Sequence, residues 1–416
     1  MNWISITFFS LAFFIWCTML KRGADIISPA RVFGFTWSIV FGLAELKLSK
    51  LQFEWTFTDW VFVLMGPISF LVGIFIVYIL NMGNKLLSID EIRQKVREQK
   101  VNETKLFYLI LLVFITYIIG YITIFLIKGQ IPIFSFSPSA ARTEFSSFGV
   151  GLFIHNMPVV VFFSLIYHLL VHNNRGKKMI LKIVGFSTAI TYLFLLQRYS
   201  LMMMAIMSFV LLYYSSRYIR FRTMIIFISI GILVFYSVAI LRAGKIIQLV
   251  LYKSSQMKFS YEYAIFTEPY MYVVMNVENF VHAVSKLEQH TYGYFTFNYV
   301  LSLTGIKHWV EEYFTIIETP FLFSGYNTYT LFWTFYRDFG VFGLTFIPVT
   351  LGVFVGSIYY SLRRNPTIKI VSSYCVIVFV MGLSFFINLL GFLWFVYIIG
   401  WMLIIFKFVQ KHPVLE

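Results

Sequence analysis

Charged side chains are scarce in this chain. Only 12% of its 416 residues are Asp, Glu, Lys or Arg, whereas 59% are hydrophobic. Soluble domains carry about a quarter charged residues, so this scarcity excludes an ordinary soluble domain. Apolar runs of about 17 to 22 residues recur, and each is long enough to cross a bilayer as a helix. Because the runs lack the alternation of a membrane β-barrel, the sequence predicts an all-α polytopic integral membrane protein.

Cysteine is nearly absent, and familiar cofactor patterns are missing. Cys17 and Cys375 both lie in apolar runs. Two such thiols give neither a disulfide framework nor a metal site, so we interpret them as small core side chains. The sequence has no Asp-x-Asp pair, no Walker loop and no glycine fingerprint of a dinucleotide site. We therefore expect no metal and no other cofactor.

Acidic residues are outnumbered by basic ones, which gives a formal net charge of +15. Lys and Arg collect in short tracts between apolar runs, and alternate loops carry few of them. This distribution is typical of cytoplasmic loops and of contacts with membrane lipids, so nucleic acid is not needed to explain the charge. It predicts an N-terminus outside the membrane and a cytoplasmic C-terminus. Met1 to Leu20 lacks a preceding basic region, so we expect a transmembrane helix there rather than a cleavable signal peptide.

The same pattern predicts about 11 transmembrane helices, grouped into three parts of the chain. Residues 1–241 carry the first eight helices, residues 242–326 form one large outward helical loop, and residues 327–416 carry an interfacial segment and the last three helices. The expected helices are 2–20, 32–48, 60–81, 106–127, 151–171, 180–197, 200–216, 223–241, 339–361, 370–388 and 391–408.

The apolar stretch from Asn327 to Leu362 is too long for one upright span. We expect an interfacial helix over residues 328–336, a break at Arg337 to Gly340, and then a span. Arg337 and Asp338 would then lie at the outer membrane boundary.

The loop 242–326 differs in composition from the rest of the chain. It holds seven of the 18 carboxylates and three of the seven histidines. Long loops between spans are usually functional or disordered, and the many tyrosines and phenylalanines argue against disorder. We interpret this loop as the outward half of an active site.

Outward arginines are few and fall at predicted helix ends. Any one of them could simply contact lipid phosphate. Together, beside a carboxylate-rich loop, they indicate a phosphate or diphosphate site, because the guanidinium group binds phosphate oxygens through two parallel hydrogen bonds. The residues are Arg142, Arg198, Arg242 and Arg337, with Lys245 one turn beyond Arg242.

A sugar hydroxyl becomes a nucleophile when a general base takes its proton, and Asp, Glu and His are the usual bases. Asp338 is one candidate, flanked by Tyr336 and Arg337; the alternative is a structural pair between Arg337 and Asp338. His308 is another, because Trp309 beside it could stack on a sugar ring.

Two glutamates of the large loop are further candidates for the base. Glu268 precedes a proline, and Glu278 ends an apolar and aromatic run. The alternative for both, and for His308, is a solvated surface position. The sequence leaves the identity of the base open.

Four motifs give the chain a resemblance to a known family. Over most of its length it resembles bacterial oligosaccharide repeat-unit polymerases, the O-antigen (Wzy-type) polymerase family. Beyond its opening residues the large loop departs from the family, since no family motif matches the rest of it. The motifs are Gln130-Ile-Pro132 followed by Arg142, Gln197-Arg198-Tyr199, Arg242-Ala-Gly244, and Asn327-x-Tyr329 with Tyr336-Arg-Asp338-Phe-Gly340-x-x-Gly343.

The resemblance implies a GT-C-like, metal-independent glycosyltransferase embedded in the bacterial inner membrane, with its active site facing the periplasm. It would transfer a growing glycan from undecaprenyl diphosphate onto a new carrier-linked repeat unit, in the synthesis of O-antigen lipopolysaccharide or capsule-type polysaccharide. A chain-length regulator is an expected partner.

Roles for individual residues follow from the same resemblance. Arg198, Arg242 and Lys245 would hold the donor diphosphate. Arg142 and Arg337 would orient the acceptor, with Tyr336 and Trp309 beside it. Asp338, Glu268 or His308 would take the proton.

Two other functions stay open. An O-antigen ligase shares the carrier and topology but transfers the glycan to the lipid A core. A transporter or flippase for lipid-linked sugars belongs to another class; such proteins often have two related halves, which this sequence lacks.

Overall fold

The chain is helical throughout the part that the structure describes. The structure, a computed structural model, describes residues 2–21, 23–147, 149–216, 237, 248–314, 320–323 and 325–409. Within these residues the helices are joined by turns and irregular segments, and the only β pairing is an isolated bridge between Ser49 and Met257. This confirms the predicted all-α class for the described residues.

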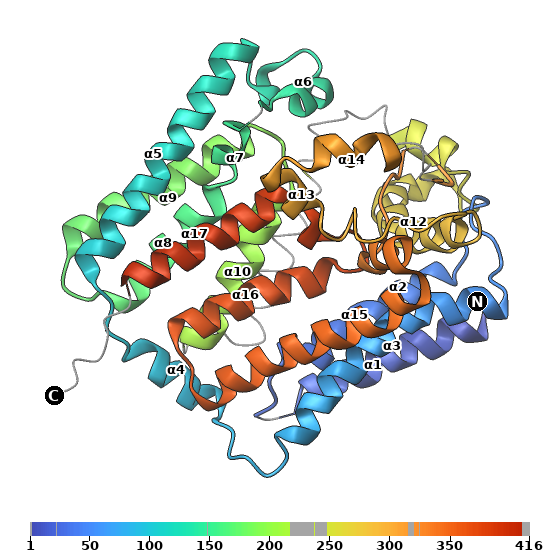
Figure 1. Cartoon of the computed structure of the whole chain (residues 1–416), viewed down its shortest axis with the longest axis horizontal. Coiled ribbons are helices and arrows are strands. Elements are labelled where there is room, and N and C mark those ends of the chain that lie inside the picture. The colour runs from blue at the N-terminus through green and yellow to red at the C-terminus, as the bar shows by residue number, and fades with distance from the viewer. Residues whose placement is uncertain are drawn as a thin grey trace. The chain divides into compact units, whose positions relative to one another are not determined.

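The helices pack into two compact units (Figure 1). The first unit comprises Met1–Leu86, Ile246–Arg364 and Ile377–Leu393. It contains α1 (Trp3–Met19), α2 (Pro29–Ala44), α3 (Phe57–Leu80), η2 (Tyr261–Phe266), α12 (Thr267–Val284), α13 (Asn298–Thr304), α14 (Lys307–Phe314), α15 (Leu331–Arg364), η3 (Leu389–Gly391) and the C-terminal half of α16 (Ile368–Leu383).

The second unit comprises Leu87–Lys245, Asn365–Val376 and Trp394–Glu416. In it, α8 packs against α5, α9 and α10. Its elements are α4 (Ile89–Arg97), α5 (Glu103–Lys128), η1 (Pro132–Phe134), α6 (Pro138–Glu144), α7 (Gly151–Ile154), α8 (Met157–Leu170), α9 (Arg175–Leu193), α10 (Tyr199–Ser215), the first half of α16 and α17 (Leu393–Val409).

Close packing of α3 against α15 forms the spine of the first unit, where the two helices run side by side (Figure 1). A Cβ atom on Gly73 would lie 2.1 Å from the carbonyl oxygen of Val349, and one on Gly352 would lie 2.1 Å from that of Phe70. Two backbones approach this closely only where side chains are missing, which is how membrane helices gain van der Waals contact. The glycines therefore fix how α15 lies on α3.

Local sequence explains where α3 begins. Thr56 caps its first turn, and the Asp59 side chain accepts a hydrogen bond from the Thr56 backbone N–H in return. This reciprocal capping box satisfies two backbone donors that a helix start leaves exposed. The loop that precedes α3 is thereby held in a defined conformation.

The predicted break in the long apolar stretch is present. Gly340 interrupts α15 with φ 60° and ψ −140°, a conformation that side-chain-bearing residues avoid. A Cβ at this position would also lie 2.9 Å from Nε2 of His290. The turn of α15 before the break, with Arg337 and Asp338, can therefore point away from the long apolar segment after it.

Every predicted helix except 223–241 overlaps an observed one; that range, apart from Ser237, lies outside the described residues. The count of 11 spans, their orientation across a membrane and the three predicted parts of the chain stay predictions. Among the described residues, four helical segments are long and apolar enough to cross a bilayer: Phe57–Leu80, Glu103–Phe134, Gly151–Leu170 and Leu331–Arg364. Shorter apolar helices are Trp3–Met19, Pro29–Ala44, Tyr199–Ser215, Ile368–Leu383 and Leu393–Val409.

The close glycine contact makes a stability prediction. We expect Gly352→Ala to destabilise the protein by about 1–3 kcal/mol, because its methyl group must push α15 off the α3 backbone. The measurement is the thermal unfolding midpoint of the purified protein in detergent. Gly382→Ala in α16 is the matched control, since a Cβ there meets no atom within 4 Å. Equal midpoints for the two variants would show that the helices do not pack this tightly.

Candidate functional site

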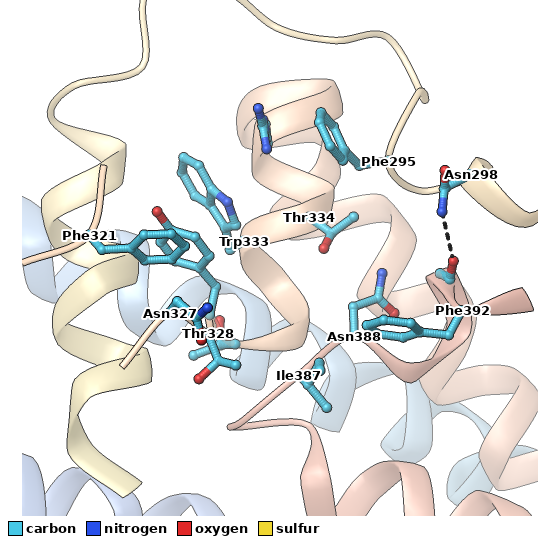
Figure 2. A pocket seen from close by; sticks show the side chains of 14 residues that line it. Phe295, Asn298, Phe321, Asn327, Thr328, Trp333, Thr334, Ile387, Asn388 and Phe392 are labelled. Carbon is cyan, nitrogen blue, oxygen red and sulfur yellow. Dashed lines mark hydrogen bonds between the residues drawn. The ribbon is translucent and has the colours of Figure 1, made fainter. Parts of the chain in front are cut away.

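A cleft in the first unit brings three distant segments of the chain together. Its volume is about 270 Å³, and it is open to the outside. Aromatic rings, amides and hydroxyls line it, and Arg337 is the only charged side chain among the described residues that do so (Figure 2). The lining residues are Phe295, Asn298, Phe321, Asn327, Thr328, Tyr329, Thr330, Trp333, Thr334, Arg337, Ile387, Asn388, Gly391 and Phe392.

Two asparagines on α12 hold one wall of this cleft. Asn279 Nδ2 donates to the carbonyl oxygens of Tyr326 at 2.7 Å and Thr328 at 3.1 Å, and its Oδ1 accepts from Leu322 N at 3.0 Å. The Thr328 hydroxyl bonds to Asn276 Oδ1. Because buried backbone groups need partners, these amides fix an irregular segment that no helix ladder could satisfy.

Three aromatic rings of this wall are stacked in series. Phe321 and Tyr329 have ring centroids 4.8 Å apart, and Tyr329 and Trp333 have centroids 5.0 Å apart. The interplanar angles are 28° and 27°. Figure 2 shows Phe321 and Trp333 on the same side of the cleft, opposite Asn388 and Phe392. Such a rigid apolar wall suits the C–H face of a sugar ring.

Arg337 is almost fully buried at the cleft, with 5% of its surface exposed. Its guanidinium carbon lies 3.7 Å from the centroid of the Phe295 ring. A guanidinium plane over an aromatic face is attracted by the ring quadrupole, and the contact holds the plane in one orientation. The cleft therefore contains a positioned cation in poorly hydrated surroundings.

The Asp338 carboxylate points into the protein rather than into the cleft. It is fully buried and accepts hydrogen bonds from the Thr291 hydroxyl, from Phe295 N at 3.3 Å and from Thr296 N at 2.6 Å. Two backbone hydrogen bonds link the same segments: Thr291 N donates to the carbonyl of Arg337, and Tyr292 N donates to the carbonyl of Asp338. Asp338 thus ties residues 291–296 to α15, which sets Phe295 against Arg337.

Glu278, considered from the sequence as a base or a solvated loop charge, is instead fully buried in α12. Its oxygens accept from Lys47 Nζ at 2.8 Å, from Gln52 Nε2 at 2.9 Å and from Trp55 Nε1 at 2.9 Å. Burial raises the pKa of the Glu278 carboxyl, and the Lys47 ammonium opposes the shift. Glu278 therefore fastens α12 to the segment between α2 and α3.

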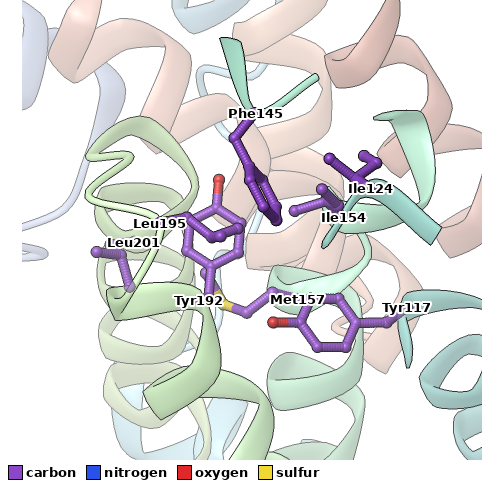
Figure 3. Close-up of a cluster of buried hydrophobic side chains, with 8 residues drawn as sticks. All are labelled: Tyr117, Ile124, Phe145, Ile154, Met157, Tyr192, Leu195 and Leu201. Atoms are coloured by element: carbon purple, nitrogen blue, oxygen red, sulfur yellow. The ribbon is translucent and has the colours of Figure 1, made fainter. Parts of the chain in front are cut away.

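Arg142 and Arg198 lie in the second unit, where one apolar cluster anchors both of their segments (Figure 3). Phe145, three residues after Arg142, packs in this cluster with Leu195 and Leu201, which flank Arg198 by three residues on either side. Both arginines are half-buried, and Arg198 precedes the first residue of α10. The two segments expected to bind phosphate are thus held by the same core.

The remaining sequence candidates are dispersed. Arg242 and Lys245 lie outside the described residues. His308 is exposed in α14, and Trp309 beside it is 80% exposed. Glu268 is half-buried in the first turn of α12, and Tyr336 packs edge to face on Phe280 and His290. None of these four lines the cleft.

Carboxylates and imidazoles are missing from the described lining of the cleft, and no three His, Cys, Asp or Glu side chains gather as a metal site in the described part of the chain. What the cleft supplies is an aromatic wall, hydrogen-bonding amides and one fixed cation. These groups suit a polar ligand, and a general base would have to come from another segment of the chain.

Sequence reasoning found Asn327, Tyr329 and Arg337 through one motif, and all three line the cleft. It missed Asn298 and Asn388, which face the cleft from other segments (Figure 2). A signal existed for Asn388, because it begins the break between two apolar runs and caps η3 by accepting from Leu390 N at 3.1 Å.

Comparisons of the chain with family models, with curated proteins and with solved structures find no match.

The hydrogen bonds of Asp338 distinguish a structural role from a catalytic one. We expect Asp338→Ala to lower stability by about 1–3 kcal/mol, because one buried donor (Thr291) and two half-buried donors (Phe295 and Thr296) lose their acceptor. Unfolding midpoints in detergent measure this. Asp90→Ala is the control, as its side chain is 87% exposed in a surface pair with Arg93. An unchanged midpoint for Asp338→Ala would show that Asp338 does not hold residues 291–296 against α15, and it would favour a catalytic role for this carboxylate.

The ion pair of Glu278 makes a second prediction. Glu278→Ala removes the acceptor of Lys47 Nζ, Gln52 Nε2 and Trp55 Nε1, while the Lys47 ammonium keeps the Glu45 carboxylate at 3.3 Å. We expect a loss of about 1–3 kcal/mol, because buried donors are left unsatisfied. Glu278→Gln keeps one acceptor oxygen and should therefore unfold at a higher temperature than Glu278→Ala in detergent. Equal midpoints for Glu278→Ala and the unaltered protein would show that Glu278 does not fasten α12 in this way.

Proposed function

We propose that the chain is a membrane glycosyltransferase that polymerises undecaprenyl-diphosphate-linked oligosaccharide repeat units without a metal ion. The observation that carries the proposal is the cleft of the first unit, in which an aromatic wall and several amides surround the buried Arg337. Sugar rings pack on aromatic faces, and amides bind hydroxyl and acetamido groups. This combination suits a glycan better than it suits an apolar ligand or an inorganic ion alone.

The position of the cleft on α15 supports a lipid-linked substrate. Trp333, Thr334 and Arg337 belong to the N-terminal turns of the helix Leu331–Arg364, which is long and apolar enough to cross a bilayer. The cleft therefore sits at one end of a membrane-length segment. A glycan attached to a polyprenyl chain reaches such a place while its lipid stays in the membrane.

The arginines of the second unit support a second, anion-binding function. In the proposal, Arg198 binds the donor diphosphate together with Arg242 and Lys245. Guanidinium groups at fixed positions stabilise the charge that develops on a departing diphosphate. The apolar cluster that holds the segments of Arg142 and Arg198 supplies that fixed position.

The proposed reaction is a substitution at the anomeric carbon of the donor. The acceptor hydroxyl oxygen forms a new glycosidic bond as the bond from the anomeric carbon to the diphosphate oxygen breaks. The diphosphate leaves with the electron pair, and the hydroxyl proton passes to a general base. Glu268 and His308 suit that role better than Asp338, whose oxygens already accept three hydrogen bonds.

Reconstitution tests the proposal. Purified protein in vesicles, supplied with its undecaprenyl-diphosphate-linked repeat unit in EDTA, should give a ladder of lipid-linked oligomers resolved by size. We expect Arg198→Ala and Arg337→Ala each to reduce polymer at least about 100-fold, as removal of one charge-stabilising donor does in other enzymes. Arg364→Ala is the control, because this exposed arginine lies at the far end of α15.

Three results would contradict the proposal in different ways. Intact substrate that has crossed the vesicle bilayer indicates a transporter. Transfer of glycan to added lipid A core, without a carrier-linked ladder, indicates a ligase. A normal ladder from Arg198→Ala protein removes that arginine from the donor site.

A further inference from the structure

We propose that the cleft of the first unit recognises an acetamido sugar, a pyranose ring that carries an N-acetylated amino group in place of one hydroxyl. The inference rests on the proposed function and names the substrate class of that site. Its basis is a pair of buried polar atoms on residues that line the cleft, the indole nitrogen of Trp333 and the hydroxyl oxygen of Thr330. Neither atom has a hydrogen-bond partner in the described part of the chain.

The two residues lie one helical turn apart, and Trp333 N donates to the Thr330 carbonyl at 3.2 Å. Trp333 is 3% exposed and Thr330 is 1% exposed. Figure 2 shows the nitrogen-bearing edge of the Trp333 ring turned away from Phe321, on the side of the cleft where Thr334 lies. Buried polar groups are nearly always hydrogen-bonded, so two such atoms without partners beside a cleft indicate groups that a ligand satisfies.

The backbone on both sides of Thr330 is fixed. Before it, Asn279 Nδ2 donates to the carbonyl of Thr328 at 3.1 Å; after it, Leu331 N donates to the carbonyl of Ser384 at 2.7 Å. These bonds hold the hydroxyl, and the indole one turn later, in place before a ligand arrives. A site organised in advance loses less entropy when the ligand binds.

An acetamido group supplies both missing partners. Its carbonyl oxygen can accept from an indole N–H, which can only donate, and its own N–H can donate to a hydroxyl oxygen. Its methyl group suits the apolar surroundings that the stacked rings of Phe321, Tyr329 and Trp333 provide. A ring hydroxyl offers a single oxygen and no methyl group, so it matches this lining less completely.

The charge of the lining agrees with a neutral ligand. Arg337 is the one charged side chain among the described lining residues, and the fully buried carboxylate of Asp338 interacts with it electrostatically. Because the cation has an opposite charge nearby, the cleft needs no anionic substituent on the sugar. An uncharged amide therefore fits it.

The test is ligand binding to the full chain in phosphatidylcholine nanodiscs, measured by saturation-transfer NMR titration. The probes are methyl N-acetylglucosaminide and methyl N-acetylgalactosaminide, each compared with the methyl glycoside that has a hydroxyl in place of the acetamido group. In at least one of these pairs we expect the acetamido sugar to bind about tenfold more tightly, as two additional hydrogen bonds between uncharged groups would give.

Two substitutions assign the preference to the cleft. Trp333→Phe keeps an aromatic ring without the N–H, and Thr330→Val keeps the shape of the side chain without the hydroxyl. Each should reduce the preference about threefold, since each removes one of the two hydrogen bonds. Both variants should fold, because each removes a buried polar atom that has no partner in the described structure.

Matched controls lie outside the cleft. Trp401 Nε1 and Ser372 Oγ are also buried without a hydrogen-bond partner among the described residues, and neither residue lines the cleft. Trp401→Phe and Ser372→Ala should therefore keep the full preference for the acetamido sugar.

Equal binding within both pairs of glycosides would overturn the inference, and so would a preference that survives in both Trp333→Phe and Thr330→Val. A preference that Trp401→Phe reduces as much as Trp333→Phe does would also overturn it, because the loss would not be specific to the cleft. The polymer ladder keeps the two proposals apart. A ladder without a preference for the acetamido sugar refutes only this inference, and acetamido binding without a ladder refutes only the polymerase.

Discussion

The candidate site depends on one buried carboxylate, that of Asp338. It joins the loop 291–296 to the turn of α15 that precedes the break at Gly340. Phe295 belongs to that loop and Arg337 to that turn, so the same tie sets the ring against the guanidinium group. A carboxylate that accepts three hydrogen bonds inside a protein is costly to leave unpaired. The Asp338 carboxylate therefore specifies one arrangement of the loop 291–296 and α15. The shape of the cleft depends on that arrangement.

Buried polar groups hold the first unit together alongside its apolar contacts. Glu278 fastens α12 to the chain before α3, and Asn279 on the same helix holds the wall that carries Tyr329. In surroundings poor in water, a hydrogen bond made by such a group is strong, and a buried polar group without a partner costs free energy. Apolar contact alone discriminates weakly between arrangements of helices in a membrane, whereas these paired groups fix one. The wall of the cleft thus depends on hydrogen bonds buried beneath it.

Sequence alone predicted the helical class and the break in α15, because the apolar stretch was too long for one span and contained Gly340. It also singled out Asn327, Tyr329 and Arg337, which line the cleft. It could not predict the direction of the Asp338 side chain, which depends on donors more than 40 residues earlier. Likewise, the partner of Glu278 lies 231 residues away, so a pattern of neighbours gave no sign of its burial. Tertiary pairing decides such positions, and local periodicity does not.

The central claim is that the cleft between Trp333 and Asn388 holds the glycan. Cryo-electron microscopy of the full chain with its lipid-linked repeat unit tests this most directly. The account predicts sugar density against the stacked rings of Phe321, Tyr329 and Trp333. Glycan density elsewhere in the protein, with the cleft free of it, would contradict the account.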